Sequence, residues 1–466
     1  MTNNKTLLLF IKKDKKFLLF LFIVSFLVRV IFFGLFLSHD KNYFRSDSLR
    51  YSETANQIFN GNGIKRVDGS YNFWRVPGYS IFLAFCYKLF DGDHIKSLLV
   101  QIFLSSFIPL LIFLLSLVLF KFDILLAKIS SIFSAFLLGY ILYSGLMMTE
   151  SLFCIFFYIF IILFLLNFNF FFCKTSFTRN SFINIFLAGI FLGISSLLRP
   201  MGHYFMPLFI LMLLLNKNYF IQNLKRSGLF FFGWLIIVFW WLLRNYLLTG
   251  FIFFHTLPGH HLLYYAAVPI DVAIKKISPI QSSDRILINE RKELYRCKEE
   301  KIGRKLIDIE KCCIDEKLAF NYIKRGPFLF FKNSIYNMIK TCLSLHSSTI
   351  LAILGHSPPS YYKIGRTFWD LIKRFLFPPV KNIFIRGIIF SEIFLLFFIL
   401  LGFLFCLIKS FFDINLFCII FKFLPVILFM IILTFATGFA RLRLPIEPFL
   451  IIPAFYFWLS FFKRIS

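Results

Sequence analysis

Long apolar runs decide what this chain can fold into. About twenty residues are enough for a helix to cross the bilayer core, and runs of that length lie at about 17–37, 97–120, 124–143, 151–172, 228–243 with its flanks, 385–408, 414–434 and 446–462. Two shorter runs, at about 182–198 and 203–215, lie on either side of Arg199 and Pro200 and predict two more helices. We therefore expect an all-α polytopic membrane protein with about ten transmembrane helices.

Composition supports a membrane protein and argues against one that binds nucleic acid. Of the 466 residues, 59% are hydrophobic, whereas a soluble domain has about 45–50%. The net charge of +28 comes from Lys and Arg residues that are scattered over loops and segment ends. They form no single stripe of the kind that binds nucleic acid, so anionic lipid headgroups and lipid phosphates are the expected counter-charges.

The basic short loops predict the orientation and the division of the chain. With the N-terminus in the cytoplasm every inner loop is basic, as the positive-inside rule requires. The predicted parts are an N-terminal transmembrane bundle at 1–243 with a first outer loop at 38–96, an outer loop domain at 244–384, and C-terminal transmembrane helices at 385–466. The charged stretch 284–317 of the outer domain predicts one or two solvated helices.

A polar stretch, residues 45–79, follows the first apolar run. Within it Asp47, Tyr51 and Ala55 are spaced four apart, which places them on one face of a helix. The sequence Asn-Gly-Asn-Gly at 60–63 is expected to end that helix. The Pro-Gly pair in Arg-x-Pro-Gly-Tyr at 75–79 predicts a fixed turn.

Ionisable residues gather at the outer ends of the apolar runs, where charge is costly and indicates function. Carboxylates beside arginines suit the transfer of a sugar carried on a lipid phosphate. A carboxylate takes the proton of the acceptor hydroxyl, and the arginine forks bind the departing phosphate. Any single arginine there is also explained by snorkelling to the interface. The residues are Asp47, Glu53, Arg75, Glu150, Arg199, His203, Arg244, Arg441, Arg443 and Glu447.

The order of these residues resembles that of the integral-membrane glycosyltransferases of the GT-C fold, which use polyprenyl-phosphate sugars. That superfamily includes protein O-mannosyltransferases, aminoarabinose lipid A transferases and rhizobial lipopolysaccharide-core galacturonosyltransferases. The resemblance covers roughly the first 250 residues and the C-terminal tenth, and is specific as a series of motifs. The motifs are Asp47-x3-Tyr51-x3-Ala55, Gly61-x-Gly63, Arg75-x-Pro77-Gly78-Tyr79, Phe90-Asp91-Gly92, Met148-Thr149-Glu150-Ser151, Gly193-x4-Leu198-Arg199-Pro200, Arg244-Asn245-Tyr246 and Ala440-Arg441-Leu442-Arg443-Leu444-Pro445.

The resemblance implies an inverting glycosyltransferase that acts on the outer, periplasmic face of a bacterial inner membrane. Asp47 would be the general base and Glu150 a second acid. The donor would be a polyprenyl-phosphate sugar, and the acceptor a lipopolysaccharide or other glycan, a lipid or a protein. The predicted substrate-binding residues are Tyr51, Arg75, Arg199, His203, Arg244, Arg441 and Arg443. Among them Arg441 and Arg443 resemble the basic residues that lie near the lipid phosphate in that superfamily.

The neighbours of Asp47 depart from one branch of that superfamily. Protein O-mannosyltransferases carry an Asp-Glu pair at this position, whereas Asp47 lies between Ser46 and Ser48. The departure weakens the case for a protein acceptor.

Metal dependence and thiol state stay open at this point. Some members of the superfamily need a divalent metal ion and others do not, and no confident cofactor follows. Candidate ligands are His203, His255, His260 and His261 with Asp47 or Glu150. Cys297 could pair with Cys312 or Cys313 in an oxidising compartment, and free thiols are the alternative.

A flippase or transporter of a lipid-linked sugar is the alternative class of function. It would require polar residues at mid-membrane and internal symmetry, whereas Arg29 alone lies well inside a predicted helix and no repeat is visible. For a transferase we expect the Asp47 carboxylate within about 10 Å of an outer arginine, the separation that a sugar phosphate needs.

Overall fold

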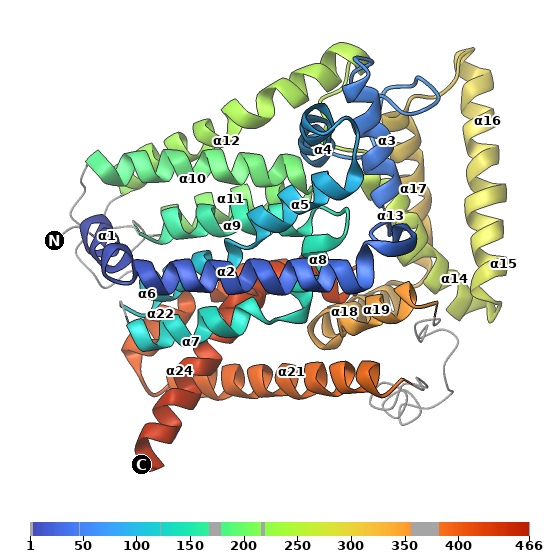
Figure 1. Cartoon of the computed structure of the whole chain (residues 1–466). Coiled ribbons are helices and arrows are strands. Elements are labelled where there is room, and N and C mark those ends of the chain that lie inside the picture. The colour runs from blue at the N-terminus through green and yellow to red at the C-terminus, as the bar shows by residue number, and fades with distance from the viewer. Residues whose placement is uncertain are drawn as a thin grey trace.

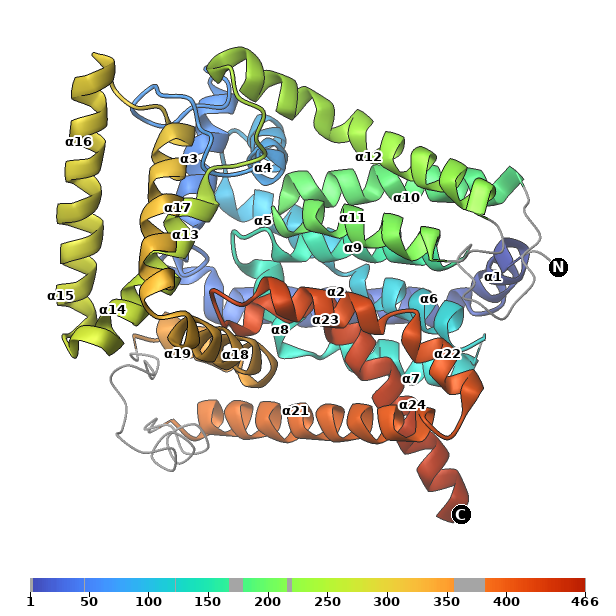
Figure 2. The same ribbon diagram turned by 180° about the vertical axis from the view of Figure 1, so that it is seen from behind.

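The structure is a computed structural model that describes residues 3–45, 47–121, 123–166, 179–215, 220–355 and 382–465. In these ranges the regular elements are helices, together with one isolated bridge between Lys65 and Tyr71. The long apolar helices run side by side, and the helices of the outer loops gather at one end of them (Figure 1). Both marked ends of the chain lie toward the other end of the molecule (Figures 1 and 2).

The apolar helices follow the ten predicted runs in order. By length and composition seven described helices can cross a membrane, and an eighth span combines α7 (Ile124–Ala135) with α8 (Leu138–Gly145), which are bent by 49°. The helices α9 (Glu150–Leu165) and α11 (Met201–Leu214) are shorter but apolar. The prediction of an all-α polytopic membrane protein is confirmed, although the end of the run at 151–172 lies outside the described residues. The seven long spans are Lys15–Leu37, His94–Leu119, Ser181–Leu198, Phe220–Thr249, Ile383–Ser410, Ile414–Leu433 and Ala440–Lys463.

Several spans consist of two helical segments. Proline in the first turn of α6 and of α23 has no amide hydrogen with which to continue the preceding helix, so a new helix begins there. The helices and helical segments of the long spans, with the N-terminal helix, are α1 (Asn3–Lys13), α2 (Lys15–Phe32), η1 (Phe33–Leu37), α5 (His94–Ser105), α6 (Ile108–Leu119), α10 (Arg179–Leu198), α12 (Phe220–Thr249), α21 (Ile383–Ser410), α22 (Ile414–Phe421), α23 (Leu424–Leu433) and α24 (Glu447–Ile465).

The break between α7 and α8 explains the charge inside the first span. Arg29 is fully buried, and its Nη1 donates to the carbonyl oxygen of Ser25 at 3.0 Å and of Ala135 at 3.5 Å. Ala135 is the last residue of α7, so its carbonyl has no amide of the same helix to accept from. In an apolar interior such a carbonyl needs a donor, and Arg29 supplies it.

Glycines bring α10 and α12 into backbone contact. A Cβ atom at Gly189 would lie 2.2 Å from the carbonyl oxygen of Phe230, and one at Gly233 would lie 2.3 Å from that of Phe186. Small residues at a helix interface are the usual means of such close approach in membranes. This pair forms one wall of the bundle.

The outer helices come from two loops. The first outer loop supplies α3 (Ser48–Phe59) and α4 (Gly78–Leu89), which pack on each other. The later loop is held by a small apolar core that includes Leu263, Ile286 and Tyr322. Its elements are α13 (Leu257–Leu262), η4 (Leu263–Ala267), α14 (Val268–Lys275), α15 (Pro279–Ser283), η5 (Asp284–Glu290), α16 (Arg291–Ile302), α17 (Asp308–Arg325), α18 (Pro327–Leu343) and α19 (Ser347–Ile353).

In the stretch predicted to form solvated helices, one helix is solvated and the next packs on the outer core. Residues 356–381 of the predicted outer domain lie outside the described residues. The helix α16 buries no residue, as predicted for a solvated helix, whereas α17 buries Cys312, Leu318 and Tyr322 along one face. The helix α12 continues to Thr249 and so includes the flank that follows the apolar run at 228–243, and the Arg244 guanidinium lies 4.7 Å from the centre of the Trp241 ring.

The three cysteines for which a disulfide was considered are free thiols. Cys297 and Cys313 are exposed, and Cys312 is buried. The Cys312 sulfur accepts a hydrogen bond from the backbone N–H of Gly259 at 3.4 Å. Of the two alternatives left open by the sequence, the structure has the free thiols.

Candidate functional site

The helix α3 positions Asp47. Asp47 directly precedes the helix, and Tyr51 and Ala55 follow on its buried side. The helix ends at Phe59, and two glycines, at 61 and 63, then adopt φ angles of 78° and 77°, a conformation that residues with a Cβ rarely adopt. The predicted helix and its end are confirmed; Ser46, one neighbour of Asp47, lies outside the described residues.

The Arg-Val-Pro-Gly-Tyr sequence brings the first outer loop against the bundle. A Cβ atom at Gly78 would lie 2.6 Å from the carbonyl oxygen of Leu197, near the end of α10. Only glycine therefore fits where α4 begins. Because Arg75 lies just before this contact and Arg199 just after the end of α10, the contact draws both arginines to the same region.

Five side chains form a continuous series of acid–base contacts, which we call the ion-pair chain. Arg75 Nη2 lies 2.6 Å from Asp47 Oδ1, and Arg441 Nη1 lies 3.7 Å from Asp47 Oδ2. The same Arg441 nitrogen lies 3.8 Å from Glu150 Oε1, which is 3.3 Å from Arg199 Nη1. The expected proximity of Asp47 to an outer arginine is confirmed.

The ion-pair chain has an accessible end and a buried end. The side chains of Asp47 and Arg441 are 26% and 24% exposed, whereas that of Glu150 is 2% exposed. The guanidinium of Arg75 donates to the Tyr51 hydroxyl at 3.0 Å and lies 5.0 Å from the centre of that ring. Asp47 is therefore the carboxylate of this chain that a substrate can reach.

The surroundings of Asp47 keep it ionised. Burial raises its pKa, but the charges of Arg75, Arg441 and Arg50 lower it, and the resulting pKa lies below the ordinary value of 3.8. At neutral pH Asp47 is a carboxylate that is able to accept a proton.

The predicted histidines form no metal site among the described residues. Burial lowers the pKa of His260 and of His261 to about 4, and that of His255 well below its ordinary value. His203 makes a 2.5 Å hydrogen bond from Nδ1 to the Pro200 carbonyl and packs on aromatic rings. Among the described residues no group of three or more His, Cys, Asp or Glu could hold a metal ion.

Two of the predicted substrate-binding arginines are used by the fold. Arg244 donates to the Ile64 carbonyl at 3.0 Å and lies over the rings of Trp241 and Phe73. Arg443 donates to the carbonyls of Cys342 at 2.7 Å and Ser344 at 2.8 Å, at the end of α18. Both arginines therefore fasten outer segments to the bundle.

Sequence reasoning missed Arg50 and His346. Arg50 follows Asp47 by three residues, and its charge lowers the pKa of Asp47. This spacing at the start of a helix could have indicated in the sequence that the two side chains interact. His346 Nε2 lies 2.9 Å from Glu447 Oε1. The sequence carried no signal for that pair because the two residues are 101 positions apart.

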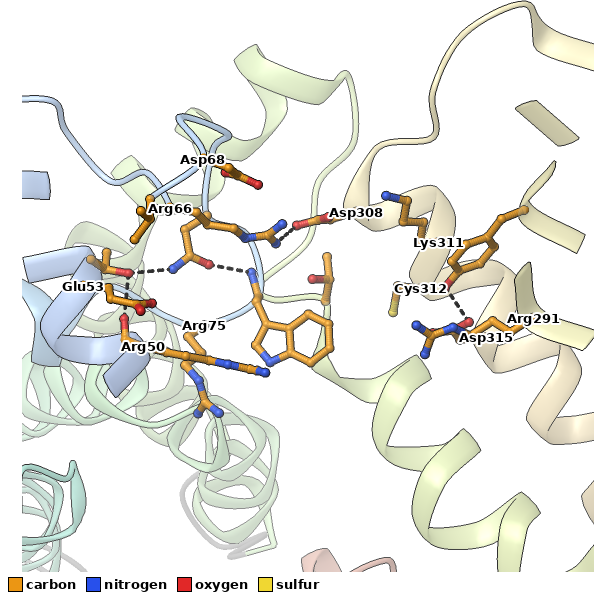
Figure 3. A pocket seen from close by; sticks show the side chains of 16 residues that line it. Arg50, Glu53, Arg66, Asp68, Arg75, Arg291, Asp308, Lys311, Cys312 and Asp315 are labelled. Atoms are coloured by element: carbon orange, nitrogen blue, oxygen red, sulfur yellow. Dashed lines mark hydrogen bonds and ion pairs between the residues drawn. The ribbon is translucent and has the colours of Figure 1, made fainter. Parts of the chain in front are cut away.

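The described residues line two kinds of hollow. An outer cavity of about 600 Å³ lies between the first outer loop and the helices α16 and α17, and Arg75 is part of its wall (Figure 3). Cavities of about 290 Å³ and 320 Å³ share Phe136, Leu137 and Leu395 and together make an apolar groove beside α21. Its polar end is formed by His346, Glu392, Arg443 and Glu447.

These features define an all-α polytopic membrane protein with an acid–arginine site at one end of its spanning helices. Among solved structures the chain is similar to archaeal oligosaccharyltransferase AglB from Archaeoglobus fulgidus, in complex with an inhibitory peptide and a dolichol-phosphate. The TM-score is 0.52 at 14% identity, and the match covers 97% of this chain and 51% of AglB, so the chain spans about half the length of that protein. No protein-family model and no curated protein matches the chain. The likeness confirms the expectation of a GT-C-like membrane fold.

Proposed function

We propose that the chain is a membrane glycosyltransferase that moves one sugar from a polyprenyl-phosphate donor to an acceptor on the outer face of the membrane. The observation that carries the proposal is the ion-pair chain, in which Arg441 contacts both the exposed Asp47 and the buried Glu150. The likeness to AglB, whose structure contains a dolichol-phosphate, supports a lipid-linked donor. The basic inner loops support a cytoplasmic N-terminus, and the membrane we propose is a bacterial inner membrane.

Asp47 is the proposed general base of a single inverting displacement. As the acceptor oxygen forms its bond to the anomeric carbon, Asp47 takes the hydroxyl proton, and the electron pair of the breaking bond leaves with the phosphate. The lowered pKa of Asp47 keeps it deprotonated and ready at neutral pH.

Arg75 and Arg441 are the proposed phosphate clamp. Their guanidinium groups converge on Asp47, at 2.6 Å and 3.7 Å, and planar guanidinium groups suit phosphate oxygens. Glu150, held by Arg199 at 3.3 Å, positions Arg441 from the buried side. For Arg443 the contacts support a structural role, because its Nη1 is occupied by backbone carbonyls.

The apolar groove beside α21 is the proposed site of the polyprenyl tail. Its lining is apolar over most of its length, as a hydrocarbon chain requires. Its polar end includes Arg443, which is two residues from Arg441 in the sequence. A donor phosphate near Arg441 could therefore lie at the mouth of this groove.

The proposal is tested with the variant Asp47→Asn. We expect loss of transfer from a polyprenyl-phosphate sugar to acceptors in native membranes, while the variant inserts and accumulates as the wild type does, since the amide keeps the shape but cannot accept the proton. Asp284→Asn is the matched control, because Asp284 is an exposed residue of η5. Unchanged transfer in Asp47→Asn would remove the assignment of Asp47 as base.

A flippase for a lipid-linked sugar is the alternative function. It would place charges along a path between the two faces. The described ion pairs of the bundle instead lie at its ends, as the ion-pair chain and the pair Lys128–Asp14, 2.6 Å apart, illustrate. Sugar transfer by the purified protein in detergent, where no second face exists, would exclude the flippase.

A further inference from the structure

The outer cavity has the size of a ligand site. Its volume of about 600 Å³ falls within the range of about 300–1,000 Å³ that small-molecule sites occupy. One wall is the first outer loop and the other is formed by α16 and α17 (Figure 3). Arg66 and Asp308 form an ion pair that joins the two walls.

The cavity presents hydrogen-bonding groups that hold one another in place. The Asn72 amide donates to Thr54 Oγ1 at 2.9 Å, and its oxygen accepts from the backbone N–H of Trp74 at 3.1 Å. On the facing wall the Tyr295 hydroxyl donates to Asp315 Oδ1 at 2.7 Å. A ligand therefore meets donors and acceptors that are already fixed in direction.

Trp74 adds an aromatic surface to the cavity wall. Its ring lies 5.4 Å from the Arg50 guanidinium and 5.0 Å from the His260 ring. The indole Nε1 is buried and has no hydrogen-bond partner among the described residues. Because this nitrogen has almost no accessible surface, a ligand in the cavity meets the ring of Trp74 and not its N–H.

We propose that the outer cavity binds the acceptor of the reaction and that this acceptor is a saccharide. A sugar ring offers hydroxyl groups that both donate and accept, around an apolar C–H face. Carboxylates, an amide and arginines can bind those hydroxyls, while the Trp74 ring packs on the C–H face. The assignment as acceptor rests on the proposed glycosyltransferase function; the binding of saccharide does not.

Arg75 connects this cavity to the reaction site. Arg75 is part of the cavity wall, and its guanidinium lies 2.6 Å from Asp47. A saccharide held in the cavity thus needs to extend past one side chain to present a hydroxyl to Asp47. The body of the acceptor and its reactive end are accommodated by adjoining surfaces.

A peptide acceptor fits the same surface less well. Extended peptides commonly add a strand to an exposed sheet edge, and helical peptides use an apolar groove. In the described structure the sole β-type pairing is the isolated Lys65–Tyr71 bridge, and charged side chains line both cavity walls. The polar lining favours hydroxyl-rich ligands.

The test is a binding measurement on the full-length protein in lipid nanodiscs without donor. The probes are an array of defined bacterial-envelope oligosaccharides and a separate array of peptides containing Ser and Thr. We expect an oligosaccharide series to bind, Trp74→Ala to weaken its Kd at least about tenfold, and Trp74→Phe to weaken it less. Trp240→Ala, at an exposed position of α12, is the matched control.

Each outcome decides a separate question. Absence of oligosaccharide binding, equal Kd in Trp74→Ala and wild type, or Trp74-dependent binding of peptides would overturn the proposal. A melting curve of each variant shows that a lost signal does not come from unfolding. Sugar transfer to acceptors in native membranes is measured on the same preparation and tests the glycosyltransferase function independently. Transfer without oligosaccharide binding would contradict only the proposed acceptor site, and oligosaccharide binding without transfer would contradict only the glycosyltransferase function.

Discussion

Two arginines that are two residues apart in the sequence have different tasks. Arg441 bridges Asp47 and Glu150, whereas Arg443 donates to carbonyls at the end of α18. We expect Arg441→Gln to reduce kcat by about 10²–10³, the usual cost of losing one charge-stabilising donor. Its melting temperature should change little, because Asp47 keeps Arg75 and Glu150 keeps Arg199.

Arg443→Gln is the comparison. It leaves the carbonyls of Cys342 and Ser344 without their charged donor, and each such hydrogen bond contributes about 1.5–3 kcal/mol. We expect a lower melting temperature in detergent, with kcat of the surviving protein close to wild type. The assignment of roles fails if the two variants show the opposite pattern.

The pH profile reports on the pair Arg75–Asp47. In the wild type the pKa of Asp47 is below 3.8, so the general base stays active, and its ion pair stabilises the fold, until the pH falls through that value. Arg75→Gln removes a charge that lowers the pKa. We expect the acidic limb of the kcat/KM profile to move to higher pH. An acidic limb that stays in place would separate Asp47 from the rate-determining proton transfer.

At the scale of elements, the contact between α10 and α12 is the most sensitive to side-chain size. Gly233→Ala would place a Cβ 2.3 Å from the Phe186 carbonyl oxygen. Forcing the helices apart should cost about 1–3 kcal/mol, as overpacking does in other cores. Gly228→Ala on the same helix meets nothing within 4 Å and is the control. Melting curves in detergent should show a lower melting temperature for Gly233→Ala alone.

The helices were predictable from sequence because a bilayer imposes one requirement on every span. Twenty apolar residues are visible without knowledge of any neighbour, and the helix after Asp47 was visible from its spacing and glycines. The break between α7 and α8 was not, since it depends on Arg29 of another helix donating to Ala135.

For the whole molecule, the sequence placed the candidate charges on one face but could not sort them. Asp47, Glu150 and Arg441 come from distant segments and meet, as the shared orientation suggested. Arg244 and Arg443 carry the same charge at the same interface, yet they bind carbonyls of other segments. The difference lies in tertiary contacts across up to 180 residues of sequence, which no local pattern reports.

The ion-pair chain contains three arginines and two carboxylates, and this excess of positive charge bears on what happens after the sugar has moved. The proposed donor is a phosphate diester with one negative charge. The polyprenyl phosphate that is left behind is a monoester, which carries about 1.5 to 2 negative charges at pH 7. The clamp should therefore hold the spent carrier more tightly than the donor. We expect added polyprenyl phosphate to inhibit competitively with a Ki below the donor KM, and a Ki well above it would contradict this. Turnover would then be limited by the departure of the empty lipid from the membrane-embedded groove.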